Sequence, residues 1–190
     1  MWELLSLLLG AALVNNLALS QFLGLCPLVG VSSRWNAALP MGIATAFVMT
    51  VATLSTHAVY NHLLEPYSLE YLRIVVFITV IASVVQLAEL YIRTVSPLLF
   101  QLLGIYLPLI TSNCAVLGVA LMVIDLTLVE ALAVAIGGAA GLSLAIMLLS
   151  GLREQLATRP VPKILEGAPI ALVTIGIMAL AFSGFRGFGA

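Results

Sequence analysis

Charged residues are scarce in this chain of 190 residues. Asp, Glu, Lys and Arg together make up only 8% of it, whereas a soluble domain carries about 25%. Hydrophobic residues make up 63%, and the mean hydropathy is +1.22. This composition excludes an ordinary soluble domain and predicts an integral membrane protein. The formal net charge of -1 and the lack of a basic cluster also exclude a nucleic-acid binder.

Cysteine is almost absent as well. The two cysteines, Cys26 and Cys114, lie far apart in the sequence and form no Cys-x-x-Cys motif, so they are a poor disulfide framework. A cleavable signal sequence is not expected either. Glu3 stands where a signal would carry positive charge, and the first apolar run continues beyond a signal core of about 7–15 residues. We expect this segment to remain as the first membrane span.

Two long runs without any charge are interrupted by polar residues, glycine and proline. They extend from Leu4 to Ser33 and from Thr94 to Ile124, and each is long enough to cross a bilayer. A broken helix survives at membrane depth only where protein or water surrounds it, because unpaired backbone groups cost several kcal/mol in hydrocarbon. Cys26 lies in the segment FLGLCP of the first run, and Cys114 lies in LPLITSNCAVLG of the second. We therefore predict two interrupted helices inside a bundle, each with a thiol at its break.

The charge boundaries divide the chain into six apolar segments. We predict an all-α integral membrane protein, a single transmembrane domain over residues 1–190, with six transmembrane helices. Three spans per half make the second half enter from the opposite membrane face, so the halves are expected to form two inverted three-helix repeats, about 1–93 and 94–190, with the first helix of each interrupted. Pro40 is expected in the first turn of the second helix. The expected spans are residues 4–31, 36–60, 69–92, 96–125, 129–152 and 167–185.

The basic residues indicate how the spans are oriented. Alternate loops carry five basic residues on one side of the membrane and two on the other. Basic loops stay in the cytoplasm, so both termini are expected outside, in the periplasm of a bacterium. The five are Arg34, Arg93, Arg153, Arg159 and Lys163, and the two are Arg73 and Arg186.

The two cysteines are the strongest candidates for chemistry. A cysteine in apolar surroundings is usually an inert small hydrophobe, but both of these occupy matched broken segments with Asn or Pro beside them. An iron–sulfur cluster explains this pattern, because it needs thiolates on rigid backbone and N–H groups near its sulfurs. Such a cluster requires four ligands, so a second subunit would have to supply two more.

Several other polar residues and helix breakers lie near the two cysteines. They either surround a cluster or line an ion path, or they simply bind the backbone groups that are freed where the helices break. The sequence alone leaves these alternatives open. The candidates are Asn15, Asn16, Gly24, Pro27, Thr111, Ser112 and Asn113.

Gln86, Glu89 and Arg93 recur on one face of the third expected helix. Glu89 and Arg93 form either an ordinary ion pair at a helix end or, with Gln86, a way-station for an ion or proton, because intramembrane carboxylates are rare. His57 and His62 are expected to be ordinary helix-end residues and not zinc ligands. No phosphate loop, nucleophile elbow or carboxylate dyad is visible, so we predict no catalytic residues and no complete active site in this chain.

Four stretches of the sequence resemble one known family, the RnfA subunits of the Rnf complex, a bacterial ion-translocating oxidoreductase that links ferredoxin and NAD. The NqrE subunit of the sodium-pumping NADH:quinone reductase is similar throughout and is the alternative. Asn15 before Asn16 and Pro27 after Cys26 favour Rnf, whereas Ser112 stands where Thr is commoner. The stretches are LVNNLALSQFLGLCPLVGVS, EYLRIVVFITVIASVVQLAEL, PLLFQLLGIYLPLITSNCAVLGVAL and GAPIALVTIGIMALAFSGF.

The resemblance implies a [2Fe–2S] cluster inside the bacterial inner membrane, shared with the homologous subunit RnfE. Cys26 and Cys114 match the family's cysteine positions and would be this chain's ligands. It further implies electron transport coupled to Na⁺ or H⁺ movement by a non-autonomous subunit, with RnfB, RnfC, RnfD and RnfG as further partners and with ferredoxin and NAD reached only through them. The chain lacks the Ser-Gly-Ala-Thr signature of the flavin-carrying subunits, so no covalent flavin is expected.

Two other classes of protein compete with this interpretation. In a secondary transporter or channel subunit without a redox cofactor, the broken helices would bind an ion or solute and the cysteines would be incidental. In a purely structural assembly subunit, the informative feature would be Gly137-x-x-x-Gly141, since small residues let two helices approach closely in lipid.

Overall fold

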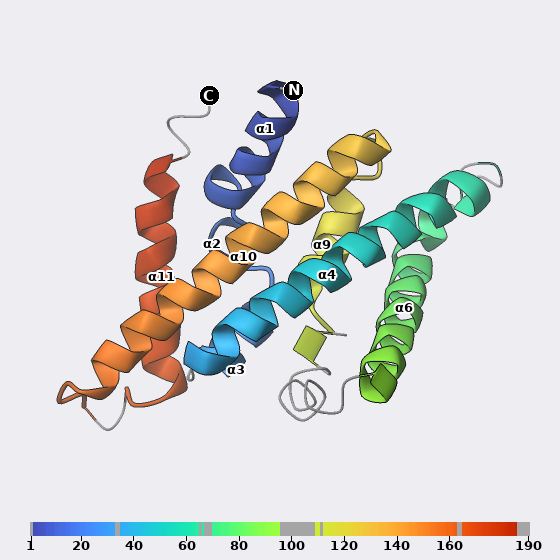
Figure 1. The fold of residues 1–190 in the computed structure, drawn as a ribbon. Helices are drawn as coiled ribbons and strands as arrows, with labels where there is room; N and C mark the ends of the chain where they lie inside the picture. The colour runs from blue at the N-terminus through green and yellow to red at the C-terminus, as the bar shows by residue number, and fades with distance from the viewer. Residues whose placement is uncertain are drawn as a thin grey trace.

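Helices form all the regular structure in the described part of the chain (Figure 1). The computed structural model describes residues 2–32, 35–64, 66, 70–95, 109–110, 112–162 and 165–185. The predicted all-α class is thus confirmed for these residues. The predicted start of the fourth span at residue 96 lies outside the described residues, as does Thr111.

Two long helices lie side by side at the centre of the molecule, α4 (Trp35–Val59) and α10 (Leu128–Ala157) (Figure 1). They approach closely because Gly42 of α4 has no side chain; a Cβ there would lie 2.7 Å from Ser143 Oγ of α10. The start of α10 is fixed by Glu130, whose carboxylate accepts hydrogen bonds from the backbone N–H and the hydroxyl of Thr127.

The small residues of α10 also hold the N-terminal helix. A Cβ on Gly137 would lie 2.5 Å from the carbonyl oxygen of Leu8, and one on Gly141 would lie 2.6 Å from that of Ala12. The role expected for Gly137-x-x-x-Gly141, a close helix contact, is confirmed. The helices that use it are α1 (Trp2–Leu9) and the π-helix η1 (Gly10–Val14).

The first run is interrupted as predicted. After η1 the chain turns at Asn15 and Asn16 into α2 (Leu17–Ser20), turns again, and continues as α3 (Leu25–Val31). The second turn needs left-handed backbone at Phe22 (φ 57) and Gly24 (φ 82). Phe22 is unusual there, because its Cβ makes this conformation costly.

The remaining helices surround the central pair. The helix α6 (Arg73–Val95), entered through a short 3₁₀ turn η3 (Glu70–Leu72), packs on α4, and α11 (Ala168–Ser183) packs on α2 and α10. The short helix α9 (Cys114–Met122) packs on α4. At its C-terminal end, α4 continues as a π-helix, η2 (Tyr60–Leu64), where the ring of Tyr60 meets that of Phe77 edge to face.

The start of α4 corrects one expectation. The helix begins at Trp35, so Pro40 lies inside it and beyond the first turn. A proline there removes one hydrogen bond of the helix, which the neighbouring helices of a bundle allow. The prediction that Pro40 would lie in the first turn is therefore wrong.

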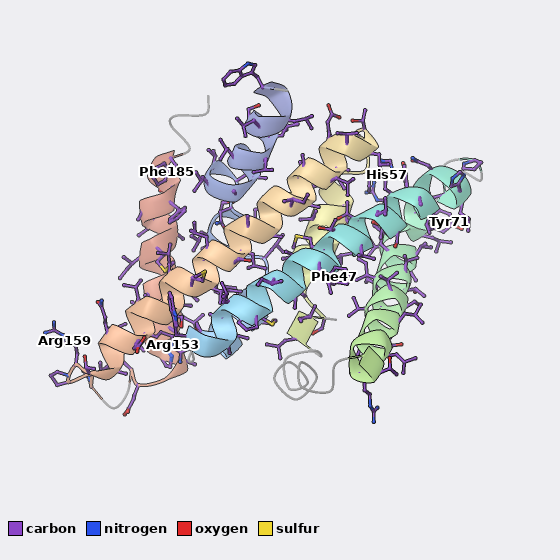
Figure 2. The ribbon with its side chains drawn as sticks, in the orientation of Figure 1. Phe47, His57, Tyr71, Arg153, Arg159 and Phe185 are labelled. Atoms are coloured by element: carbon purple, nitrogen blue, oxygen red, sulfur yellow. The ribbon has the colours of Figure 1, made fainter. Side chains whose placement is uncertain are left out.

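Two described helices are long and apolar enough to cross a membrane, over residues 37–64 and 128–157. Three shorter apolar helices cover residues 4–14, 73–87 and 168–183. The helix α1 begins and α11 ends at one end of the molecule, and Arg153 and Arg159 lie at the other (Figures 1 and 2). The six-span count, the inverted repeat and the orientation in the membrane stay predictions.

Candidate functional site

The two cysteine-bearing helices, α3 and α9, start at the same place in the structure. The backbone N–H of Gly24, which precedes α3, donates a hydrogen bond of 2.9 Å to Sγ of Cys114, the first residue of α9. Cys26 follows Gly24 by two residues, so their Cα atoms are at most about 7 Å apart. The two cysteine segments therefore meet. We call Gly24, Cys26, Asn113 and Cys114 the cysteine crossing.

The two thiols differ in their surroundings. Both are free; Cys26 is exposed on the surface of this chain, whereas Cys114 is half-buried. Cys26 is the second residue of α3 and Cys114 the first of α9, so each lies in a first helical turn, where backbone N–H groups have no partner within the helix.

Only glycine fits at position 24. Its φ of +82° is left-handed, and a Cβ would lie 3.1 Å from Leu142 Cδ1 and 3.3 Å from Ala115 Cβ. The missing side chain lets the backbone N–H come within hydrogen-bonding distance of the Cys114 sulfur. Gly24 thus joins the first broken run to the second.

Asn113 caps α9. Its Oδ1 accepts a hydrogen bond from the backbone N–H of Ala115 at 3.0 Å, and its side chain is only 3% exposed. Its amide nitrogen, Nδ2, is buried and has no hydrogen-bond partner among the residues that the structure describes. A buried donor in this position is unusual, since most buried polar atoms are paired.

Asn16 has a different role. Its Oδ1 accepts from the backbone N–H groups of Ala18 and Leu19, and its Nδ2 donates to the carbonyl oxygens of Ala12 and Gly141. The bonds from Ala18 and Leu19 satisfy N–H groups that are free at the start of α2, and the bond to Gly141 ties the break to α10. For Asn16 the structure therefore favours the second of the two alternatives, binding of the freed backbone, over an ion path.

The other residues predicted near the cysteines differ in how deeply they are buried. Pro27 is buried in the first turn of α3, where the N–H that it lacks would have no partner within the helix. Ser112 is exposed in the turn before Asn113. Asn15 is exposed at the end of η1 and lines a separate cavity.

Each cysteine is followed four residues later by a glycine, and each glycine receives a leucine from the other broken segment. A Cβ on Gly30 would lie 3.0 Å from Leu109 Cδ2, and a Cβ on Gly118 would lie 2.6 Å from Leu23 Cδ1. The two contacts hold the two broken segments together beyond their breaks. The inverted repeat stays a prediction.

Sequence reasoning missed two contacts that hold the far ends of these segments. Arg153 of α10 donates from Nη1 to the carbonyl oxygen of Val29 and to Ser32 Oγ, both at 2.9 Å. His57 of α4 lies with Nε2 3.0 Å from the carbonyl oxygen of Leu126, beyond the end of α9. Arg153 was visible in the sequence as a boundary charge, but nothing in the sequence shows that it turns back onto α3.

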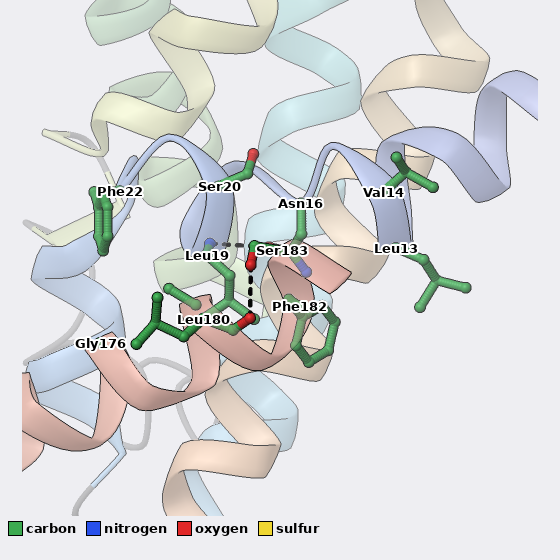
Figure 3. A pocket seen from close by; sticks show the side chains of 11 residues that line it. Leu13, Val14, Asn16, Leu19, Ser20, Phe22, Gly176, Leu180, Phe182 and Ser183 are labelled. Atoms are coloured by element: carbon green, nitrogen blue, oxygen red, sulfur yellow. Dashed lines mark hydrogen bonds between the residues drawn. The ribbon is translucent and has the colours of Figure 1, made fainter. Parts of the chain in front are cut away.

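Two cavities lie along the first broken run. One, of about 320 Å³, is lined by three neutral polar side chains, Ser6, Asn15 and Gln21, together with apolar residues. The other, of about 220 Å³, lies between this run and α11 and is mostly apolar, with Phe22 and Leu180 in its wall (Figure 3). The first is suited to water or an ion, the second to an apolar group.

Gln86 and Glu89 lie on α6, which is not part of the cysteine crossing. Gln86 is exposed and Glu89 is half-buried. Their role as a way-station stays a prediction. Among the described residues, no three His, Cys, Asp or Glu side chains are grouped so that they could hold a metal ion.

These features define a helical membrane protein with a pair of thiols where two broken helices meet. The model of one family, described as "Rnf-Nqr subunit, membrane protein", matches residues 4–188, and the chain belongs to this family.

Curated relatives agree with the family. The chain is 52% identical over 189 residues to the RnfA protein of the ion-translocating oxidoreductase complex of Glaesserella parasuis serovar 5, covering 98% of both chains. It is 51% identical over 189 residues, again 98% of both, to the protein of the same name in Syntrophotalea carbinolica. It is 50% identical over 186 residues, 97% of both, to the corresponding protein of the Na(+)-translocating ferredoxin:NAD(+) oxidoreductase complex of Acetobacterium woodii.

The resemblance to RnfA is thereby confirmed over nearly the whole chain. The relatives are named as subunits of oxidoreductase complexes. This agrees with a non-autonomous membrane subunit of a redox enzyme complex that works in electron and ion transport.

Proposed function

We propose that this chain supplies two of the four protein ligands of a [2Fe–2S] cluster inside the membrane, Cys26 and Cys114. The observation that carries the proposal is the hydrogen bond from Gly24 N–H to Cys114 Sγ, because it places the two cysteine segments against each other. The chain has only two cysteines, so the homologous subunit RnfE would provide the remaining two ligands.

The donor set fits this group. Thiolates are the ligands that iron–sulfur clusters use, and N–H groups near sulfur stabilise them. The crossing offers the Gly24 N–H and the Nδ2 of Asn113, which has no partner among the described residues. When bound, the group would supply one-electron transfer across the hydrophobic interior.

The residues around the thiols would keep the site in shape. Asn113 fixes the start of α9, and Gly24 holds Cys114 against the start of α3. Arg153 binds the far end of α3, which fixes where Cys26 lies along that helix's axis. Cys26 is exposed on the isolated chain, and this is the side on which a partner subunit would bring its own two cysteines.

The proposed complex is an Rnf-type ferredoxin:NAD oxidoreductase in a bacterial inner membrane, with RnfB, RnfC, RnfD, RnfE and RnfG as partners. The relative from Acetobacterium woodii is named as Na⁺-translocating, and Na⁺ or H⁺ is the ion we propose for this chain. The cavity lined by Ser6, Asn15 and Gln21 supports an ion path beside the first broken run, because neutral oxygen atoms suit a small cation.

The test uses the whole complex, purified with this chain as wild type, Cys26→Ser or Cys114→Ser. Iron content and the electron paramagnetic resonance spectrum of the reduced complex are measured. We expect each replacement to remove the same cluster signal and the ferredoxin:NAD activity. Ser55→Ala is the matched control, because the Ser55 hydroxyl bonds only within α4, and it should leave both unchanged.

Retention of the full signal in both cysteine variants would contradict the proposal. Ion or solute uptake into vesicles by this chain alone, indifferent to both replacements, would instead support a secondary transporter. If a cysteine replacement caused other subunits to leave the complex while the remaining complex kept its iron, a purely structural role would be supported.

A further inference from the structure

Two asparagines cap helices next to the breaks, and they differ in the hydrogen bonding of one side-chain atom, Nδ2. Asn16 and Asn113 both accept backbone hydrogen bonds through Oδ1. The Nδ2 of Asn16 donates to two carbonyl oxygens, whereas the Nδ2 of Asn113 is buried without a partner among the described residues. The side chains are equally buried, at 1% and 3% exposed, so solvent does not explain the difference.

The amide NH₂ of Asn113, unpaired among the described residues, lies within the cysteine crossing. Oδ1 of Asn113 is 3.4 Å from the position that a Cβ of Gly24 would occupy, and the Gly24 N–H reaches Cys114 Sγ at 2.9 Å. The bond from Ala115 N–H to Oδ1 pins the carboxamide, which in turn fixes the position of Nδ2. Asn113 is also the immediate neighbour of Cys114.

An unsatisfied buried donor is costly, so the assembled site is expected to provide an acceptor. The –NH₂ group donates only, and it therefore does not coordinate a cation. Sulfur already serves as an acceptor in the crossing, at Cys114, the residue next to Asn113. A metal-bound thiolate or sulfide carries more negative charge than a thiol and accepts more strongly.

We propose that Nδ2 of Asn113 donates a hydrogen bond to a sulfur atom of the metal–sulfur group bound at the cysteine crossing, and that this bond raises the reduction potential of that group. Reduction adds negative charge, so a donor stabilises the reduced form more than the oxidised form. Asn113 is thus a positioning and tuning residue and no ligand. This inference rests on the proposed function and adds to it a residue that controls the reduction potential of the bound group.

The experiment compares Asn113→Ser with Asn16→Ser in the whole complex. Serine keeps an oxygen that caps the helix in either place but removes the amine. The midpoint potential of the cluster is measured by a redox titration followed by electron paramagnetic resonance. The thermal stability of the iron-free complex is measured separately.

For Asn113→Ser we expect a midpoint potential that is more negative by about 59 mV. For a one-electron couple this is roughly a tenfold change in the oxidised-to-reduced ratio. The stability of the iron-free complex should not fall, because the lost amide NH₂ has no partner among the described residues. For Asn16→Ser we expect the opposite pair of results, an unchanged midpoint and a less stable iron-free complex.

An unchanged midpoint in Asn113→Ser, with the cluster still dependent on Cys26 and Cys114, would overturn this inference and leave the proposed function intact. A wild-type complex whose iron does not depend on the cysteines would overturn both.

A second measurement is used if the complex with Asn113→Ser does not assemble. Pulsed electron paramagnetic resonance of the wild-type complex labelled with ¹⁵N-asparagine should show a coupling between the cluster and a side-chain nitrogen, and its absence would overturn the inference.

Discussion

The helices α3 and α9 each carry one cysteine, but different contacts hold their starts. Asn113 caps α9 from within the same segment, and Cys114 is half-buried. No side chain caps the start of α3; it follows the left-handed Gly24, whose N–H is bound by a sulfur of the other segment, and Cys26 is exposed.

This difference shows that α9 contains its own cap, whereas α3 depends on contacts with distant parts of the chain. Arg153 lies more than a hundred residues from Val29, and Cys114 lies far from Gly24 in the sequence. Replacements that remove such distant contacts should therefore disturb the Cys26 side of the site more than the Cys114 side.

Removal of the Arg153 contact is expected to have the largest effect. Arg153→Gln loses a charged donor to Val29 O and Ser32 Oγ, and hydrogen bonds to charged groups contribute about 1.5–3 kcal/mol each. We expect a destabilisation of about 3 kcal/mol, a lower thermal midpoint for release of this chain from the purified complex, and faster alkylation of Cys26 in the iron-free complex.

Arg159→Gln is the control for this prediction. Arg159 is exposed beyond the end of α10, so its replacement should leave stability and Cys26 alkylation as in the wild type. Equal effects of the two replacements would show that charge at this membrane boundary matters and that the contact to α3 does not.

Gly24→Ala should have a smaller effect on stability. Left-handed backbone costs a residue with a Cβ about 1–2 kcal/mol, and the new methyl group would press on Leu142. The Gly24 N–H should then move away from Cys114 Sγ, and the cluster spectrum should broaden. In Gly176→Ala, where a Cβ meets no atom within 4 Å, stability should be equal or slightly higher.

His57→Leu should have the smallest effect of the three. It removes the hydrogen bond to Leu126 O beyond the end of α9, a contribution of about 1 kcal/mol. The start of α9 keeps its own cap, so the cluster spectrum should not change. His62→Leu, at an exposed residue of η2, is the control. A larger loss of cluster in His57→Leu than in Arg153→Gln would reverse the comparison between α3 and α9.

The sequence was sufficient to predict that the first run is broken. Two runs without charge are longer than a simple membrane span, and Asn, Gly and Pro interrupt them around each cysteine. This pattern predicted broken helices packed inside protein. The structure confirms the breaks in the first run, and it adds a contact between Gly24 and Cys114. Gly137 and Gly141 were likewise predictable as a close helix contact, because small residues have that role in membranes.

The contacts that fix the geometry could not be predicted from one sequence. Asn16 bonding to Gly141 O, Arg153 to Val29 O and His57 to Leu126 O join residues far apart in the chain, and no local pattern encodes such pairs. The left-handed conformation of Phe22 was missed for a similar reason, since an aromatic residue has no local preference for it. The position of Pro40 was mistaken although the helix starts within one residue of the predicted start, because a proline was expected only in a first turn, whereas neighbouring helices allow one inside α4.

The most direct test of the central claim is an experimental density map of the assembled complex, with an anomalous difference map recorded at the iron absorption edge. The account predicts an iron peak bonded to Sγ of both Cys26 and Cys114, with the other ligands coming from the neighbouring subunit. A map in which these two sulfur atoms lie apart, or face lipid with no iron between the subunits, would contradict it.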